Sequence, residues 1–132
     1  MQIDGGCHCG NISYEADVDP DKVIVCHCTD CQAVSGTAFR TIVFVPENQF
    51  TLHNGGLKTY IKTADSGNKR ALTFCPECGT HIYATSVGSG EKVLGLRGGT
   101  ARQRGELRPG KQYWCRSALN WIADLGAIEQ VE

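Results

Sequence analysis

The sequence lacks any apolar run close to the roughly 20 residues that a helix needs to cross a bilayer. Its first six residues carry neither the basic segment nor the apolar stretch of a secretory signal. These two absences lead us to expect a cytoplasmic protein. A charge excess of one sign is also missing, because 13 Lys and Arg residues face 14 Asp and Glu residues and the net charge is −1. This balance predicts neither a nucleic acid nor an anionic membrane as a partner.

The chain also lacks the marks of the common nucleotide-binding folds. Strand and helix patterns do not alternate as they do in βαβ units. The glycines at 98 and 99 have neither the dinucleotide-binding spacing nor the lysine of a phosphate-binding loop. No repeat or low-complexity tract divides the 132 residues. A chain of this length, 41% hydrophobic, predicts one folded domain over residues 1–132.

Short segments of β-type sequence, separated by Gly, Pro, Asn and Asp, make up most of the chain. Alternating or β-branched patterns predict strands at 11–16, 22–26, 38–45, 57–63, 70–74, 80–85 and 92–96. Two short helices are expected, at 29–34 and at 117–125, the second with Ser117 as its N-cap. The sequence therefore predicts an all-β fold of packed antiparallel sheets with short helical segments.

Eight cysteines are the strongest compositional feature. In a chain expected in the cytoplasm they predict metal ligands or reactive thiols before disulfides. Seven of them form three groups, which are Cys7-His-Cys9, Cys26-His-Cys28-Thr-Asp-Cys31 and Cys75-Pro-Glu-Cys78. The eighth, Cys115, stands alone and is expected to be a buried thiol.

Each spacing suits the ligation of a metal ion by thiolates. A C-x-x-C pair followed by glycine, as at Cys75 and Cys78, is a knuckle that turns two thiolates toward one ion. A C-x-C pair on an extended segment, as at Cys7 and Cys9, points both side chains to the same face, because strand side chains alternate with a period of two. The C-x-C-x-x-C run adds a third thiolate one turn later.

Seven clustered thiols divide into four and three. A Zn²⁺ closed by four protein ligands is structural, whereas one held by three keeps a position for water or substrate and can be catalytic. Cys26, Cys28 and Cys31 lie within six residues and form the natural three-ligand site. The spacing alone leaves another division open: Cys7 and Cys9 with Cys26 and Cys28, and Cys31 with Cys75 and Cys78. A redox-active or simply reduced thiol set is the alternative to a second metal.

Taken in order, these motifs resemble those of a known family. The segments concerned are Gly6-Cys-His-Cys-Gly10, Cys26-His-Cys-Thr-Asp-Cys31, Ser35-Gly36 and Phe74-Cys-Pro-Glu-Cys-Gly-Thr80, with weaker support from Ser117-Ala-Leu-Asn-Trp121. Together they resemble the glutathione-dependent formaldehyde-activating enzyme (GFA) family, whose fold is Mss4-like and all-β. The resemblance implies two Zn²⁺ per chain: a structural zinc on Cys7, Cys9, Cys75 and Cys78, and a catalytic zinc on Cys26, Cys28 and Cys31.

The resemblance also implies an activity, that of a carbon–sulfur lyase of the S-(hydroxymethyl)glutathione synthase type. Such an enzyme reversibly joins formaldehyde, or a similar aldehyde, to the thiol of glutathione, so its partners are a small thiol and a small aldehyde. The chain departs from the family pattern at Gln32 and Ala33, where two basic residues usually follow the third cysteine of the central motif. This departure weakens any grip on an anionic substrate there. The alternative function is a non-catalytic zinc module that binds a small thiol or a protein partner.

Most other conspicuous side chains are expected to have structural roles. His8 and His27 each lie between two cysteines, so on extended backbone their rings point away from the metal. His81 is expected to pack on a strand. The segment from Ser35 to Thr37 could equally line the open zinc position or form a plain turn.

Arginines and large aromatic residues complete the candidates. A solvated basic loop is expected to carry four arginines, although they could instead pair with the carboxylates of glutathione. They are Arg97, Arg102, Arg104 and Arg108. The aromatic residues expected in the core are Phe39, Phe44, Trp114 and Trp121.

Overall fold

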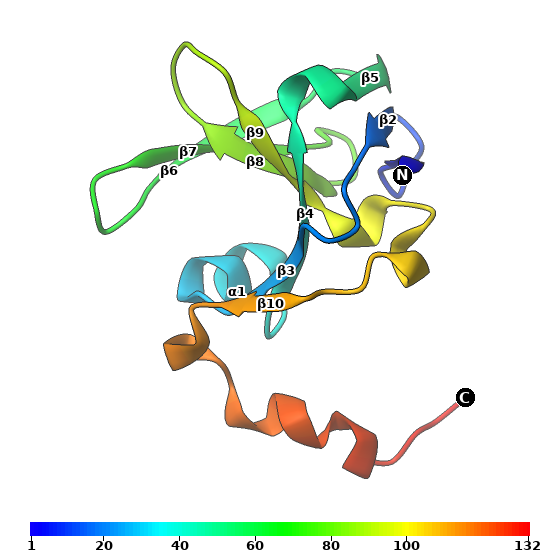
Figure 1. The fold of residues 1–132 in the computed structure, drawn as a ribbon, viewed down its shortest axis with the longest axis vertical. Coiled ribbons are helices and arrows are strands. Elements are labelled where there is room, and N and C mark those ends of the chain that lie inside the picture. Colours follow the sequence, from blue (N-terminus) through cyan, green and yellow to red (C-terminus); the bar gives the residue numbers. More distant parts are fainter.

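The computed structural model describes all 132 residues and contains two β-sheets with one short α-helix. The smaller sheet has the strand order β1-β2-β5, with β1 at Gln2–Gly6, β2 at Ser13–Asp17 and β5 at Phe50–Asn54. The larger sheet has the order β10-β3-β4-β9-β8-β7-β6. Its strands are β3 (Val23–Cys26), β4 (Arg40–Pro46), β6 (Lys58–Thr63), β7 (Lys69–Phe74), β8 (His81–Ser86), β9 (Val93–Arg97) and β10 (Lys111–Tyr113). Figure 1 shows β4 running through the middle of the molecule, with the hairpin of β6 and β7 projecting to one side.

The helix α1 spans Thr29–Ser35 and follows directly on β3. Its first turn is capped by Cys28, and Gly36 ends it in the left-handed region with φ 70°. The remaining helical segments are short 3-10 turns at Glu47–Gln49, Gly98–Thr100, Arg104–Glu106 and Cys115–Ser117, and a longer one at Asn120–Ala127. None of these helices has the length and the apolar character that a membrane crossing requires.

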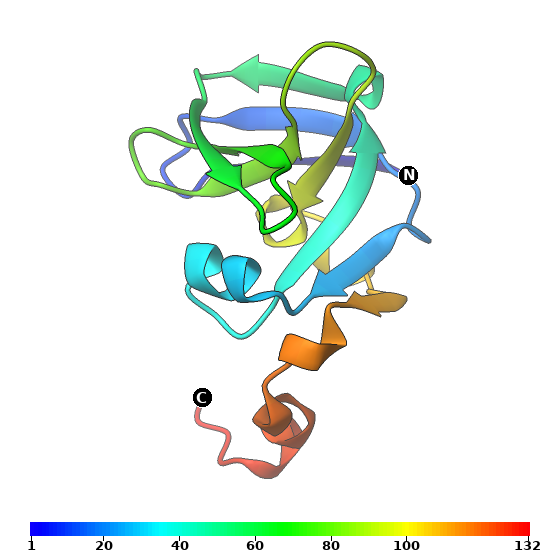
Figure 2. The same ribbon diagram turned by 90° about the vertical axis from the view of Figure 1, so that its left-hand side faces the viewer.

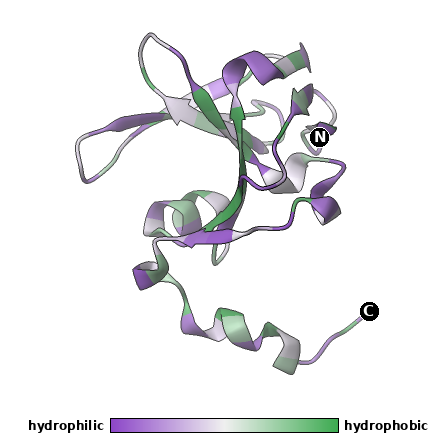
Figure 3. Ribbon diagram, viewed as in Figure 1, coloured by the Kyte–Doolittle hydropathy of each residue, from purple (hydrophilic) through white to green (hydrophobic).

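The main core lies between the two sheets. Val43 and Val45 of β4 and Leu94 and Leu96 of β9 are almost fully buried there and pack with Tyr14 of the small sheet. Because strand side chains alternate, Ile42 and Phe44 of β4 face the other way. They pack in a second, smaller cluster with Ile24 and Cys26. Figure 3 shows the hydrophobic colour concentrated along β4. The large sheet therefore has one face on the main core and one face toward α1.

The predicted fold class is confirmed, and each of the seven predicted strands is present with boundaries shifted by a few residues. Three strands were not predicted: β1, β5 and β10. Nearly all pairs are antiparallel, as expected, but β10 runs parallel to β3. The helix predicted at 29–34 is confirmed as α1.

The prediction of a helix at 117–125 is wrong in the type of helix and in the residue at which it begins. The structure has a 3-10 segment at Asn120–Ala127, and Ser117 belongs to the preceding turn and caps nothing. No residue of this segment is buried, so no packing pulls it into a regular α-helix. Figures 1 and 2 show it extending below the sheets, away from the rest of the molecule.

Two of the expected core aromatics and the lone cysteine are also placed differently. Trp114 and Trp121 are 55% and 50% exposed, and Cys115 is exposed as well. All three lie at or beyond the end of β10, where the chain has already left the sheets. Phe39 and Phe44 are half-buried.

Candidate metal centre

Four sulfur atoms from two distant segments converge in one cluster. The Sγ atoms of Cys7, Cys9, Cys75 and Cys78 all lie within 4.8 Å of one another. The Cys7 and Cys9 sulfurs are 3.5 Å apart, and the Cys9 and Cys75 sulfurs are 3.8 Å apart. Zinc–sulfur bonds of about 2.3 Å in a tetrahedron place the sulfurs about 3.8 Å from each other. The two distances match this spacing, so the four thiols could hold one tetrahedral metal ion.

Local backbone geometry builds each half of this cluster. Gly10 and Gly79 have φ of 84° and 79°, a region that side chains with a Cβ rarely adopt, and they close the turns after the two cysteine pairs. The backbone N–H of Ile12 donates to the Cys7 sulfur at 3.2 Å, and the N–H of Glu77 donates to the Cys75 sulfur at 3.4 Å. Such donors stabilise thiolates and orient them toward a metal.

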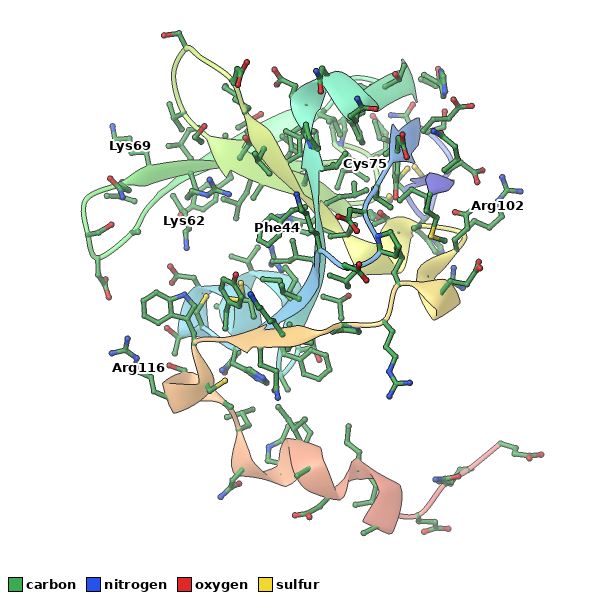
Figure 4. The ribbon with its side chains drawn as sticks, in the orientation of Figure 1. Phe44, Lys62, Lys69, Cys75, Arg102 and Arg116 are labelled. Carbon is green, nitrogen blue, oxygen red and sulfur yellow. The ribbon has the colours of Figure 1, made fainter.

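The cluster joins the two sheets. Cys7 and Cys9 follow β1 of the small sheet, whereas Cys75 and Cys78 form the turn between β7 and β8 of the large sheet. Cys75 is fully buried, and Figure 4 shows it on the side of the molecule that holds the small sheet. A metal ion here would connect two segments that are about half the chain apart.

A second cluster contains three sulfurs from one short stretch. The Sγ atoms of Cys26, Cys28 and Cys31 lie within 4.8 Å of one another. Cys26 ends β3 and is buried, Cys28 is the N-cap of α1, and Cys31 lies in the first turn of that helix. The backbone N–H of Cys31 donates to the Cys28 sulfur at 3.3 Å. The change from strand to helix within six residues therefore brings the three thiols together.

The thiols of the two clusters differ in how readily they ionise. The hydrogen bond from the Cys31 thiol, supported by further hydrogen bonds and by the charge of Arg40, lowers the pKa of Cys26 to about 5. The same hydrogen bond, together with burial, raises the pKa of Cys31. In the other cluster the Thr80 hydroxyl, 3.2 Å from the Cys78 sulfur, lowers the pKa of Cys78 to about 5. Each cluster thus holds a thiolate at neutral pH, which is the form that binds metal.

No histidine or carboxylate completes either cluster. His8 is exposed, and His27 is buried with its Nε2 2.7 Å from the side-chain oxygen of Gln112. His81 stacks on Phe74 within the sheet, as expected, with ring centroids 5.4 Å apart. The donor sets are therefore all thiol, four in one cluster and three in the other, which suits zinc.

The residues that follow the three-sulfur cluster hold the backbone in place. Gln32 donates from Nε2 to the carbonyl oxygens of His27 and Ser117, at 2.8 and 3.0 Å. The Ser35 hydroxyl donates to the carbonyl of Cys31 at 2.6 Å, and Gly36 ends the helix. Gln32 stands where the resembled family usually has a positively charged residue. Its hydrogen bonds connect α1 to the start of the C-terminal segment.

Sequence reasoning missed a group of arginines beside the three-sulfur cluster. Arg97 belongs to β9 and is buried, so it is not part of a solvated loop. Arg40 on β4 is also buried, and Arg70 on β7 is half-buried. The other three arginines of the predicted loop are exposed, and Arg102 pairs with Asp4. The available signal was the period of two, which places Arg40 on the same strand face as Ile42.

These features define a class: a small two-sheet protein whose thiol clusters, of four and of three, could each hold a metal ion. A family model described as glutathione-dependent formaldehyde-activating enzyme matches residues 2–117 of the chain. The match spans most of the sequence, so the protein belongs to the GFA family. The family resemblance expected from the cysteine motifs is confirmed.

A solved structure supports the fold. The crystal structure of a Rhodobacter sphaeroides protein resembles this chain with a TM-score of 0.62 and 16% sequence identity. The likeness covers 83% of this chain and 98% of that one. At this identity the comparison concerns the arrangement of the strands and says nothing of the reaction.

Proposed function

We propose that the protein is a zinc-dependent carbon–sulfur lyase of the GFA type. It would reversibly join formaldehyde, or a similar small aldehyde, to the thiol of glutathione or a similar small thiol. Membership of the GFA family supports the reaction class. The observation that carries the proposal is the division of seven thiols into a set of four and a set of three, because three protein ligands leave a tetrahedral ion one position for substrate.

In this proposal the chain binds two Zn²⁺ with different roles. Cys7, Cys9, Cys75 and Cys78 would hold a structural zinc that joins the sheets. Cys26, Cys28 and Cys31 would hold the catalytic zinc. When bound there, zinc would supply an electrophilic centre that keeps a thiol substrate ionised at neutral pH.

The reaction itself makes modest demands on the protein. The sulfur of the thiol forms a bond to the aldehyde carbon, the C=O π bond opens, and the thiol proton ends on the former aldehyde oxygen. Thiols add to formaldehyde without help, so the protein contributes by positioning the two reactants and by keeping the thiol ionised. Cys26, Cys28 and Cys31 would do this by presenting three sulfurs from the junction between β3 and α1. The backbone N–H of Cys31 holds the Cys28 sulfur in that arrangement.

The test compares two cysteine variants, one in the proposed catalytic cluster and one in the proposed structural cluster. The wild-type protein should contain two zinc ions per chain by elemental analysis and accelerate exchange between ¹³C-formaldehyde and its glutathione adduct, measured by NMR against the uncatalysed rate. Cys28→Ser is expected to keep a folded protein with one zinc but to lose this acceleration. Cys78→Ser is expected to unfold, because the binding energy of a structural zinc is folding energy.

Two results would contradict the proposal. If Cys28→Ser and Cys78→Ser fold and exchange formaldehyde alike, the division of roles between the clusters is wrong. If wild-type protein with two zinc ions gives no acceleration, a non-catalytic zinc module that binds a small thiol or a protein partner becomes the better description.

A further inference from the structure

The register of the large sheet brings several cationic side chains to the face that carries the three-sulfur cluster. Arg40 lies opposite Cys26 in the pairing of β3 with β4, so their side chains share that face. Two residues further along β4, Ile42 lies opposite Arg97 of β9. Arg70 lies opposite Lys62 in the pairing of β6 with β7. The face therefore carries positive charge from four strands.

These side chains surround a cavity between this face and α1. The cavity has a volume of about 110 Å³, and its wall includes Cys31 of the three-sulfur cluster. Arg40, Arg70 and Arg97 line it, and so does the pair formed by Lys62 and Asp30, whose Nζ and Oδ2 atoms are 2.7 Å apart. Figure 4 shows Lys62 extending from β6 toward α1. Small side chains such as Ala84 form part of the floor and leave this space open.

The three guanidinium groups have no carboxylate partner. Arg40 and Arg97 are only 6% and 8% exposed, yet neither forms an ion pair. The Nη2 of Arg40 and the Nε of Arg97 have no hydrogen-bond partner, and Arg97 donates only to the carbonyl of Gly95, at 3.2 Å. Buried charges in proteins are normally paired, because an unpaired charge loses its hydration without compensation.

The pKa values of the three arginines also indicate that too little negative charge lies near them. Burial, followed by the nearby charge of Arg40, lowers the pKa of Arg97 to about 9, and burial also lowers the pKa of Arg40 and of Arg70. All three groups still carry their proton at neutral pH. Asp30 is the only acidic residue in the wall, and Lys62 neutralises it.

A loaded three-sulfur site does not remove this deficit. Three thiolates with one Zn²⁺ carry a single negative charge, which matches one of the three arginines. Two positive charges remain on the wall of the cavity. The negative charge of a loaded metal site therefore balances the charge of one arginine, and the charges of the other two arginines stay unbalanced.

We propose that Arg40, Arg70 and Arg97 bind an oxyanion group, a carboxylate or a phosphate, carried by the molecule that occupies the neighbouring three-sulfur site. The identity of that neighbouring site rests on the proposed function, but binding of the oxyanion does not. Guanidinium groups bind such oxygens through paired, charge-assisted hydrogen bonds. The substrate class is thereby narrowed to small thiols or aldehydes with an anionic arm.

The dimensions limit how much of the ligand enters. A cavity of about 150 Å³ holds one benzene molecule, so about 110 Å³ holds a single anionic end group rather than a tripeptide. A second cavity of about 380 Å³ shares Arg40 and Arg97 with the first and is lined by Ser35, Thr37 and His81. This polar cavity provides room for the rest of a larger ligand.

The test measures oxyanion binding directly, by calorimetry on the zinc-loaded protein at constant ionic strength. Succinate and inorganic phosphate are the probes, and uncharged succinamide is the control ligand. We expect at least one of the two anions to bind and succinamide not to bind. Tighter binding of succinate assigns a carboxylate arm to the natural ligand, and tighter binding of phosphate assigns a phosphate arm.

Three arginine variants locate the site. Arg97→Met and Arg70→Met are each expected to weaken the binding of the anion about tenfold or more, since each removes charge-assisted hydrogen bonds. Arg108→Met is the matched control, because Arg108 is exposed and lies outside this cavity, and it should bind as the wild type does. In buffer without the anion, the melting temperature of Arg97→Met should be equal to or above that of the wild type, because a buried repulsive charge is removed. Arg70→Met provides the measurement if Arg97→Met fails to fold.

The outcomes separate this proposal from the proposed function. Failure of both anions to bind, or binding that is the same in Arg70→Met and Arg108→Met, overturns the oxyanion site even if formaldehyde exchange is catalysed. Binding that depends on the arginines, in a protein that does not catalyse exchange, supports the oxyanion site and contradicts the lyase reaction.

Discussion

A hydrogen bond between Cys26 and Cys31 shifts the pKa values of the two thiols in opposite directions. The pKa of Cys26 is lowered to about 5 because Cys31 donates to it and Arg40 lies nearby, while the pKa of Cys31 is raised by the same hydrogen bond and by burial. The cluster thus contains one ready thiolate and a donor that stabilises it. Metal would take the place of the shared proton.

This asymmetry predicts how zinc binding at the three-sulfur site depends on pH. Cys26 has already lost its proton between pH 6 and 8, so binding releases at most two protons from the cluster instead of three. The apparent binding constant of the second zinc should therefore rise by at most about a hundredfold per pH unit in this range. As pH falls through about 5, Cys26 is protonated and the dependence should steepen.

A zinc competition titration with a chromophoric chelator at several pH values gives this slope. Cys115→Ser is a suitable control, because Cys115 is exposed and outside both clusters. A slope of three protons between pH 6 and 8 would show that Cys26 is an ordinary thiol in the metal-free cluster.

At the scale of elements, the junction between β1 and the first cysteine pair leaves no room for a side chain at Gly6. A Cβ built on Gly6 would collide with the carbonyl oxygen of Ile12 and would lie 3.3 Å from the Cα of Ser13. Gly6 is the last residue of β1 and directly precedes Cys7. The absence of a side chain at Gly6 therefore lets the chain turn closely enough to present the first thiol.

Gly6→Ala is expected to lower the free energy of unfolding by about 2 kcal/mol, because the backbone at Ile12 must move. The same movement should weaken the binding of zinc at the four-sulfur cluster. Urea unfolding with elemental analysis of bound zinc measures both effects. Gly56→Ala is the matched control, since a Cβ there meets no atom within 4 Å and the residue is exposed. Equal stability of the two variants would show that the junction tolerates a side chain.

At the scale of the whole molecule, the C-terminal segment contributes little to the fold. No residue of Asn120–Ala127 is buried, and the last side-chain hydrogen bond to the sheets and helix is the one from Gln32 to Ser117. In contrast, β10 is held by backbone hydrogen bonds to its neighbours, such as those from His27 to Tyr113 and from Gly110 to Val23, both 3.0 Å long. The boundary of the packed structure therefore lies close to residue 117, where the family match also ends.

Removing residues 119–132 is expected to change the free energy of unfolding by less than about 0.5 kcal/mol and to leave the zinc content unchanged. Removing residues 110–132 also deletes β10 and exposes the edge of β3, so it should destabilise the protein by several times that amount. Thermal denaturation of the two truncated proteins makes the comparison. A large loss from the shorter deletion would mean that the segment packs on the protein in solution.

Local signals in the sequence determined much of the architecture. Alternating or β-branched patterns identified seven strands, and the cysteine spacings identified each local group of thiols, because these features depend on neighbouring residues alone. Strand β10 escaped notice because it has only three polar or aromatic residues, and β1 because two of its five residues are glycines. Strand β5 alternates apolar and polar residues over Phe50–Asn54, so its own sequence carried a signal that was missed. Trp114 and Trp121 were misjudged for a similar reason, since hydrophobicity alone cannot show whether a core is within reach.

The sequence by itself determined which residue types could bind metal and which segments present them. Cysteine spacing left open which groups meet, and the family resemblance implied that Cys7 and Cys9 join Cys75 and Cys78. The tertiary structure brings these four thiols together, because their meeting depends on how the two sheets pack. The tertiary structure alone also brought Arg40, Arg70 and Arg97 to one cavity, since they come from three strands whose register along the sheet no local pattern encodes. Thiol spacing is a short-range property of the chain, whereas the distribution of buried charge is a property of the assembled sheet.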